Sequence, residues 1–212
     1  FSRKKYYKIE SKPHTDSYEE TIEKTAYLVE DSIRRQMISD VPICTFLSGG
    51  IDSSLVTSVC AKYLDKNEVL TTYSFDFEDN DIHFQSNSFQ PTQDRPYVDI
   101  MKIYLHTEHI YLSCKYETLA DLLEPSVDSR CLPTMADVDS SLLYFCSEVA
   151  KKHKVALTGE CADEIFGGYP WFHKEEMIKA NTFPWMRDIS FRKSLLNPEF
   201  AAVLHMEQYI AN

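Results

Sequence analysis

The 212-residue sequence is poor in basic charge and lacks long apolar runs. No apolar run reaches the 18 or so residues of a membrane-spanning helix, so no membrane span is expected. Acidic side chains outnumber basic ones 33 to 22, and the resulting formal charge of −11 argues against nucleic acid as the main partner. This charge does not exclude a small anion such as a nucleotide, because Mg²⁺ and backbone N–H groups can outweigh the overall field locally.

The six cysteines form no pattern either, since they are scattered without a C-x-x-C pair or a His-rich neighbour. This distribution is typical of reduced thiols in a cytoplasmic protein rather than of a disulfide framework or a zinc site. We therefore expect a cytoplasmic protein. The length and the 43% apolar content fit one ordinary domain, or a domain with an appendage.

Glycine is the scarcest of the informative residues, because only five occur and all lie in two short clusters. Two belong to SGGIDSS, residues 48–54, and three to TGECADEIFGGY, residues 158–169. A chain that avoids glycine elsewhere uses it where backbone conformation or close approach requires it. These two segments are therefore the candidate functional motifs.

Alternating strand and helix patterns predict an α/β fold, a parallel sheet with helices on both faces. Short buried runs predict strands at residues 43–47, 69–77, 108–112 and 155–158. Helical spacing of apolar residues predicts helices at residues 18–37, 52–64, 96–105, 116–124 and 139–152. Ligands in such folds bind beyond the carboxyl ends of the strands. Since both glycine clusters directly follow strands, we expect them to face one crevice.

Two further segments stand outside this alternation. Residues 78–95 are polar and without pattern, which predicts a long loop of the kind that often serves as a functional lid. Near the end of the chain, residues 197–210 predict a capped helix that begins a helical region. The first residues contain no initiator Met and no signal-peptide pattern, so we expect a piece of a longer protein.

The SGGIDSS segment has the composition of an anion-binding turn. Its glycines let backbone N–H groups point into a concavity, and a helix beginning near Asp52 adds its positive end, which suits a phosphate or pyrophosphate. The hydroxyl groups of Ser48, Ser53 and Ser54 can donate to phosphate oxygens. Asp52 beside that anion implies an intervening Mg²⁺. The alternative is a tight turn with Asp52 as a helix cap; a Walker A loop is excluded by spacing.

The second cluster places Glu160, Asp163 and Glu164 just after a predicted strand. Three acids at the carboxyl edge of a sheet are a candidate metal-binding or acid–base group. The alternative is a helix N-terminus rich in acids, which the helix dipole alone would favour. The following segment, FGGYPW, is better explained as a sharp turn that packs aromatic side chains than as a catalytic or binding motif.

SGGIDSS resembles the pyrophosphatase loop of the N-type ATP pyrophosphatases, and together with TGECADEIFGGY it is similar to the synthetase domain of the glutamine-dependent asparagine synthetases. The likeness covers residues 17–175 or so. It implies the PP-loop, adenine nucleotide alpha hydrolase-like fold. It also implies an AMP-forming ligase: ATP adenylates the aspartate side-chain carboxylate with release of pyrophosphate, and ammonia, obtained from glutamine in the full-length protein, displaces AMP.

The resemblance assigns roles to single positions. The residues that would bind ATP or pyrophosphate are Phe46, Ser48, Gly49, Gly50, Asp52, Ser53, Ser54, Phe77, Thr158 and Gly159. Phe46 and Phe77 would flank adenine. Asp52 and Asp163 would bind Mg²⁺. Glu160 and Asp163 are the expected catalytic residues, with Glu160 beside the intermediate and accepting a proton from ammonia.

The sequence departs from the family pattern at several positions. Thr158 replaces a usual Ser, and Cys161 replaces a Gly. An Arg that many members carry before the long helix is absent from PTMADVDSS, where Asp137 and Asp139 have no assigned role. A lysine that the family uses on the ATP phosphates would lie beyond residue 212.

The resemblance also implies cofactors, partners and a division of the chain. The expected ligands are ATP, Mg²⁺, aspartate and ammonia; the expected partner is the glutaminase domain of the same parent chain, and a homodimer is allowed for. Residues 1–16 would be a linker from a missing N-terminal domain, residues 17–180 the ATP pyrophosphatase domain, and residues 181–212 an incomplete helical extension. Two alternatives stay open: a related amide synthetase of the β-lactam synthetase or lasso cyclase type, and a nucleotide-binding module without turnover.

Overall fold

The computed structural model describes residues 2–86, 90–132, 135–183, 186 and 188–210. Its centre is a sheet with the strand order β3–β2–β1–β4, in which all neighbouring strands run parallel. The strands are β1 (Ile43–Phe46), β2 (Thr71–Phe77), β3 (Glu108–Cys114) and β4 (Val155–Leu157). The predicted parallel α/β sheet is therefore confirmed.

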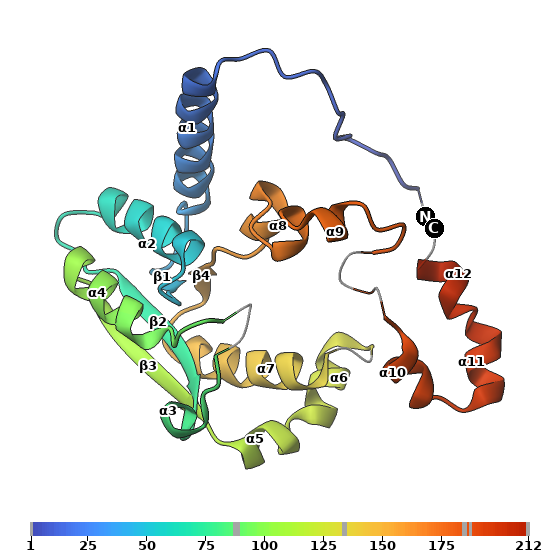
Figure 1. Ribbon diagram of the computed structural model, residues 1–212. Coiled ribbons are helices and arrows are strands. Elements are labelled where there is room, and N and C mark those ends of the chain that lie inside the picture. Colours follow the sequence, from blue (N-terminus) through green and yellow to red (C-terminus); the bar gives the residue numbers. More distant parts are fainter. Residues whose placement is uncertain (1, 87–89, 133–134, 184–185, 187, 211–212) are drawn as a thin grey trace.

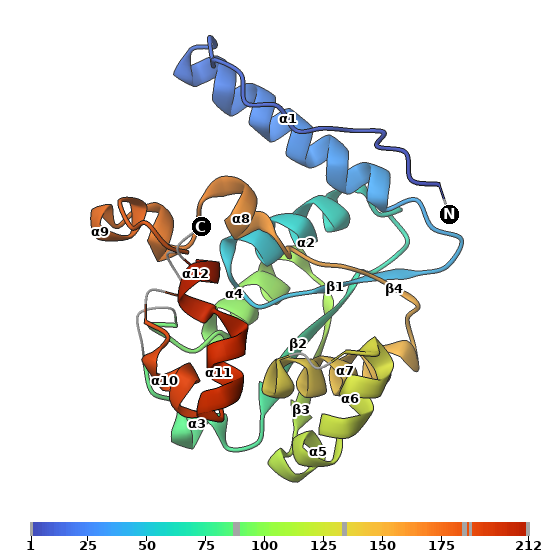
Figure 2. The ribbon, with the colours of Figure 1, turned by 90° about the vertical axis from the view of Figure 1, so that its right-hand side faces the viewer.

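Helices cover both faces of this sheet (Figures 1 and 2). Helices α1 (Tyr18–Gln36) and α2 (Ile51–Tyr63) pack on one face, and α4 (Arg95–Leu105) lies beside α2. Helix α7 (Ala136–Ala150) packs on the other face, with the shorter α5 (Tyr116–Asp121) and α6 (Leu123–Arg130) against it. The sequence patterns therefore predicted the layer arrangement.

The alternation of side chains along β1 divides the core into two apolar clusters. Ile43 packs with Val59 and Cys60 of α2 on one face. The next residue, Cys44, packs with Tyr73 of β2 and with Val149 of α7 on the opposite face. Both faces of the strand are thus buried, as expected for a parallel sheet.

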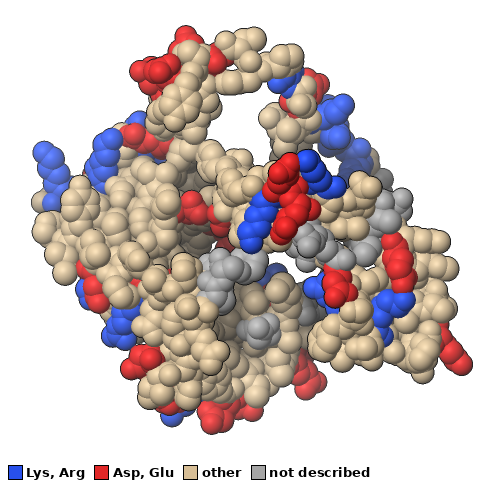
Figure 3. Space-filling model, viewed as in Figure 1, with Lys and Arg blue, Asp and Glu red and all other residues tan. Residues whose placement is uncertain are grey.

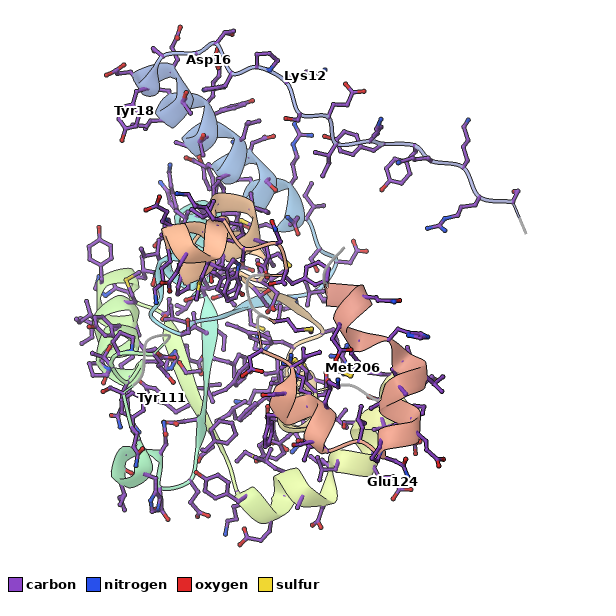
Figure 4. All side chains as sticks on the ribbon, turned by 45° about the vertical axis from the view of Figure 1, so that its right-hand side comes forward. Lys12, Asp16, Tyr18, Tyr111, Glu124 and Met206 are labelled. Atoms are coloured by element: carbon purple, nitrogen blue, oxygen red, sulfur yellow. The ribbon has the colours of Figure 1, made fainter. Side chains whose placement is uncertain are left out.

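Helix α1 begins at a capping box, because the hydroxyl of Ser17 accepts from the Glu20 N–H at 3.2 Å and the Ser17 N–H donates to the Glu20 carboxylate at 2.8 Å. Its apolar stripe reaches the core only near the C-terminal end, where Ile33 is buried. Ile22 is 51% exposed and Tyr18, at the far tip of the helix in Figure 4, is 77% exposed. The predicted helix is confirmed, but its N-terminal half extends beyond the sheet, so only part of its apolar stripe is covered (Figure 2).

Two predicted boundaries differ from the structure. The single helix expected at 116–124 is two helices that meet at Leu122, because Pro125 has no N–H to continue the earlier hydrogen-bond ladder and instead lies in the first turn of α6. The loop expected at 78–95 contains the short helix α3 (Asn80–His83), and its residues 87–89 lie outside the described part of the chain.

The remaining elements follow β4. They are α8 (Ala162–Phe166), a 3₁₀ helix (Pro170–Phe172), α9 (Glu175–Ile178), α10 (Ser190–Ser194), α11 (Pro198–Leu204) and α12 (Met206–Ile210). The expected cap at Asn197 is present, since its side chain accepts from the Glu199 N–H at 2.9 Å. The helix itself is interrupted at His205, which has a φ of 47°. None of the helices in the described ranges is long and apolar enough to cross a membrane.

The strand order places a topological switch point at β1. The chain passes from β1 to β2 and β3 on one side, and then returns to place β4 on the other side of β1. In open α/β sheets, a crevice forms at such a point beyond the carboxyl ends of the strands. SGGIDSS follows β1 and TGECADE follows β4, so the fold brings the two glycine-containing segments to this crevice.

Candidate functional site

A cavity of about 900 Å³ opens at the carboxyl ends of β1, β2 and β4. This volume is within the range of small-molecule sites, about 300–1,000 Å³. The two motifs line it together, as expected. The sequence-predicted residues in its wall are Phe46, Ser48, Asp52, Ser53, Phe77, Thr158, Gly159, Glu160 and Asp163. Three others, Gly49, Gly50 and Ser54, belong to the same turn but are not among the residues that line the cavity.

The start of helix α2 leaves backbone donors without intrahelical partners. Gly50 is the N-cap residue, and the first turn closes when the Ser54 N–H donates to the Gly50 carbonyl at 3.0 Å. The N–H groups that precede Ser54 have no carbonyl within the helix to bind, and such groups form an anion site. Asp52 lies inside the first turn rather than at the cap position. The interpretation of Asp52 as a helix cap is therefore wrong.

Two glycines are required by close approach of other segments. At Gly49, which has a φ of 79°, a Cβ atom would lie 2.6 Å from the Cβ of Tyr97 on α4. At Gly159, a Cβ atom would lie 2.8 Å from the backbone of both Asp52 and Ser53. Contacts this short are essentially never made by real Cβ atoms, so the loop after β4 and helix α4 can press on the SGGIDSS turn only at glycine.

The serine side chains hold the shape of this turn. The Ser53 hydroxyl donates to the Gly50 carbonyl at 3.2 Å and accepts from the Ser48 N–H at 3.1 Å. Ser48 Oγ lies 3.0 Å from Ser53 Oγ and also faces the Gly50 N–H at 3.4 Å. Ser53 is 9% exposed, so it acts from inside the loop, whereas Ser48 is exposed to the cavity.

Asp52 and Asp163 both line the cavity, one from each motif, and their charges interact. Burial raises the pKa of Asp52, and the negative charge of Asp163 raises it further. Gly168 leaves room for this arrangement, because a Cβ atom there would overlap the Asp163 carboxylate. Within the described ranges, no group of three or more His, Cys, Asp or Glu side chains forms a metal site. Two carboxylates nevertheless suit Mg²⁺, which typically takes one or two carboxylates and completes its shell with phosphate oxygens and water.

The FGGYPW turn packs aromatic side chains, in agreement with its structural interpretation. Gly167 has a φ of 72°, and the rings of Tyr169 and Trp171 stack with their centroids 4.3 Å apart. The Tyr169 hydroxyl also donates to Glu164 at 3.3 Å. The turn thus orders the acidic segment in front of it. Cys161, in that segment, has a φ of 68°, a conformation that favours the glycine it replaces.

An aromatic group forms the apolar wall of the cavity. Phe46 contacts Phe75 edge to face with centroids 4.8 Å apart, and Phe75 stacks on Phe145 of α7 at 4.4 Å. Phe77 also lines the cavity, and its N–H donates to the Asp76 carboxylate at 2.8 Å. This wall offers an apolar, aromatic surface beside the SGGIDSS turn.

The cavity wall also contains residues that sequence reasoning did not name. They come from the end of β2 and from the 78–95 loop, which the sequence marked only as a long polar loop of a kind that is often functional. Figure 3 shows acidic side chains in the hollow of this face. The acidic residues that line the cavity are Asp52, Asp76, Glu78, Asp79, Asp81, Asp94, Glu160, Asp163 and Glu164. Arg95 is the one Lys, Arg or His side chain among the described lining residues.

A half-buried histidine, His109 of β3, supports the segment that leads into the SGGIDSS turn. Since the Ser74 hydroxyl donates to the Leu47 carbonyl at 2.6 Å, its oxygen accepts from Nε2–H of His109 at 3.0 Å. His109 Nδ1 then accepts from the Thr72 hydroxyl at 2.7 Å. Burial lowers the pKa of His109 to about 4, so the ring is neutral near pH 7. This chain of hydrogen bonds fixes the carbonyl immediately before Ser48.

The two acids without an assigned role, Asp137 and Asp139, lie in the first turn of α7. Asp139 is 8% exposed and pairs with Arg130 of α6 at 2.6 Å, so it joins α6 to α7. The side chain of Asp137 lies outside the described part of the structure. Asp139 is not among the described residues that line the cavity.

Comparison with known proteins identifies the family of this chain. The family model described as asparagine synthase matches residues 24–212. The chain belongs to the asparagine synthase family. It is 45% identical to glutamine-hydrolyzing asparagine synthetase 3 of Bacillus subtilis over 97% of this chain and 34% of that protein. The similarity deduced from the two motifs is thereby confirmed.

More distant relatives give the same family. Glutamine-hydrolyzing asparagine synthetase 1 of Bacillus subtilis is 32% identical over 83% of this chain and 26% of that protein. Glutamine-hydrolyzing asparagine synthetase 3 of Arabidopsis thaliana is 31% identical over 68% of this chain and 25% of that protein. The chain thus spans between a quarter and a third of the length of these asparagine synthetases.

Proposed function

We propose that this chain is the nucleotide-binding core of a glutamine-hydrolysing asparagine synthetase, an AMP-forming ligase of the cytoplasm. The supporting observation is that SGGIDSS and TGECADE meet in one cavity at the switch point of a parallel sheet. Residues 17–180 would form the ATP pyrophosphatase domain, preceded by a linker and followed by the beginning of a helical extension. The glutaminase domain of the same parent chain would supply ammonia, and a homodimer is an expectation that the oligomeric state in solution tests.

In this proposal, the SGGIDSS turn holds the phosphates of ATP. The N–H groups at the start of α2 and the hydroxyls of Ser48, Ser53 and Ser54 bind phosphate oxygens. Phe46 and Phe77 flank the adenine, and Thr158 and Gly159 close the opposite side. An oxygen of the aspartate side chain attacks the α-phosphorus, and the bond from that phosphorus to the bridging oxygen breaks as pyrophosphate leaves.

Asp52 and Asp163 would hold Mg²⁺, which, when bound, neutralises charge that develops on the departing pyrophosphate. Burial raises the pKa of Asp52, and the negative charge of Asp163 raises it further. A cation bound between the two carboxylates would offset this repulsion, which supports the assignment. The second motif provides Asp163, and the missing side chain of Gly168 leaves the space that the Asp163 carboxylate occupies.

Glu160 would act in the second half-reaction. Ammonia attacks the acyl carbon, the bond from that carbon to the AMP oxygen breaks, and the nitrogen loses a proton. Glu160 is exposed at the cavity wall, where a carboxylate can accept that proton. AMP leaves with the electron pair of the broken bond.

A nucleotide-binding module without turnover is the second candidate, and one observation favours it. Nine acids but a single arginine line the described part of the cavity, so this chain alone offers little positive side-chain charge to a triphosphate. A related synthetase that adenylates another carboxylate would differ from an asparagine synthetase only in the acid that supports pyrophosphate release.

The test is pyrophosphate release from Mg·ATP with and without L-aspartate, followed by asparagine formation with added ammonia. Aspartate-dependent release is the expected result. Glu160→Gln should retain this release and lower asparagine formation by about 100-fold, the usual contribution of a general base. Glu148→Gln, altered on the surface of α7, is the control. Binding of ATP without release would favour the module, and release with a different acid would favour the related synthetase.

A further inference from the structure

We propose that Arg95 is the residue of this chain that binds an oxyanion of a substrate, either a phosphate of ATP or a carboxylate of aspartate. The inference rests on the proposed function of the cavity and adds a residue to it. Its starting point is the charge of the wall: Arg95 stands alone among nine acidic residues lining the described cavity. Both substrates are anions, so a cationic side chain at this position has a large effect on their binding.

The position of Arg95 in the fold places it next to the SGGIDSS turn. It is the first residue of α4, an eleven-residue helix. Two and three residues later, Tyr97 and Val98 lie against Gly49, whose missing Cβ would be 2.6 Å from the Tyr97 Cβ and 2.9 Å from the Val98 nitrogen. The N-terminal turn of α4 is therefore in contact with the SGGIDSS turn, and the long side chain of Arg95 emerges from this junction into the cavity wall.

The guanidinium group lies over an aromatic ring, within electrostatic reach of Asp99 but without an ion pair to it among the described residues. Its central carbon lies 4.5 Å from the ring centroid of Tyr111, which is labelled in Figure 4. The Tyr111 hydroxyl donates to Asp99 at 2.7 Å, and Lys102 pairs with the same carboxylate at 2.6 Å. Because Asp99 already has two partners, it does not need Arg95.

Stacking on a ring uses the face of a guanidinium group and leaves the N–H donors at its edge. Within the described residues, no Asp or Glu oxygen forms an ion pair with Arg95. Those edge donors match the two oxygens of a carboxylate or phosphate, and such bidentate pairs are among the strongest hydrogen bonds in proteins. Arg95 is thus oriented in advance for an oxyanion.

The competing explanation is that Arg95 only offsets the negative field of the acidic wall. A field effect depends on charge, and lysine provides the same charge. A bidentate contact depends on the planar fork, which lysine lacks. Arg95→Lys and Arg95→Met together therefore separate the two explanations.

The experiment is calorimetric titration of the folded protein and its variants with two probes: Mg·ATP, and L-aspartate in the presence of Mg·AMP. Arg95→Met should weaken one probe by about 10- to 100-fold, the effect of losing a hydrogen bond to a charged group. Arg95→Lys should recover only part of this loss. Lys102→Met is the matched control, because Lys102 lies over the same Tyr111 ring at 4.9 Å but does not line the cavity.

Each outcome has one meaning. Selective weakening of Mg·ATP assigns Arg95 to a phosphate, and selective weakening of aspartate assigns it to a carboxylate. Affinities within twofold of the unaltered protein for both probes would overturn the proposal. Equal weakening of both that lysine fully restores would overturn it in favour of the field effect. If the unaltered, folded protein binds neither probe, the proposed function itself fails.

Discussion

His109, a residue of the outer strand β3, affects the site through its hydrogen bonds to β2. Its ring forms hydrogen bonds with Thr72 and Ser74 of β2, and Ser74 in turn donates to the Leu47 carbonyl, just before the SGGIDSS turn. Burial lowers the pKa of His109 to about 4, with a smaller contribution in the same direction from Lys102 and an opposing one from Asp99. Tyr111 packs edge to face on the ring, with centroids 4.3 Å apart.

This pKa predicts a loss of stability in mild acid. The unfolded histidine titrates near pH 6.5, whereas the folded one stays neutral down to about pH 4. Between these values the unfolded chain binds the extra proton, so acidification favours unfolding. We expect His109 to contribute a loss of about 2 kcal/mol in the free energy of unfolding between pH 7 and pH 4, allowing for partial solvent access. Urea unfolding at a series of pH values measures it.

The matched variant is His109→Gln, whose amide can donate to Ser74 and does not titrate. It should be less stable than the unaltered protein at pH 7, yet lose less stability on acidification, because glutamine takes up no proton. The carboxylates are common to both proteins, so their contribution cancels in the comparison. Parallel stability curves for the two proteins would contradict the role given to this ring.

Single residues were predictable from the sequence where chemistry and position coincide. Ser48, Asp52 and Glu160 follow buried strands, and strand ends in α/β folds converge, so their place in the cavity wall followed from the pattern. Arg95 and Asp76 line the same cavity but were not found. Their orientation depends on how α4 and the end of β2 pack, which no local pattern records. The roles of all these residues stay predictions.

At the scale of elements, the contact between the loop after β4 and the start of α2 is the most constrained junction. Gly159 leaves no space for a Cβ atom, since the backbone of Asp52 and Ser53 would be 2.8 Å away. Gly50, two residues before Asp52, has more space. A Cβ atom there would have Ser48 Oγ at 3.4 Å as its nearest neighbour, and its φ is −69°.

Gly159→Ala should therefore destabilise the protein by about 2 kcal/mol, a typical cost of forcing extra volume into a packed position, because backbone has to move. Gly50→Ala is the control and should cost less than about 1 kcal/mol, the loss of a favourable N-cap residue. Denaturant unfolding of both variants makes the comparison. Equal stabilities for the two variants would mean that β4 and α2 do not meet as closely as described.

Elements were predictable where a short-range signal specifies them. The helical spacing at residues 18–37 and the short buried run at residues 43–47 predict α1 and β1 almost to the residue. The break between α5 and α6 was missed although Pro125 marks it, because a proline is tolerated in the first turn of a helix and its effect depends on where that helix begins. The exposed end of α1 was missed because periodicity reports an apolar face and not what covers it.

At the scale of the whole molecule, the order β3–β2–β1–β4 explains why two motifs a hundred residues apart form one site. Alternating strands and helices predicted a parallel sheet, but not which strand β4 would join. That choice depends on tertiary packing, here the two-sided core around β1. The division at residues 17 and 180 stays a prediction, since the family match runs from 24 to 212 without marking it.

The most direct test of the account is calorimetric titration of this protein with inorganic pyrophosphate, with and without Mg²⁺, beside the variant Asp52→Asn. The account predicts binding that requires Mg²⁺ and that weakens at least about tenfold in the variant, because one carboxylate ligand is lost. Failure of the folded protein to bind pyrophosphate, or binding that depends on neither Mg²⁺ nor Asp52, would contradict the assignment of SGGIDSS as a pyrophosphate loop.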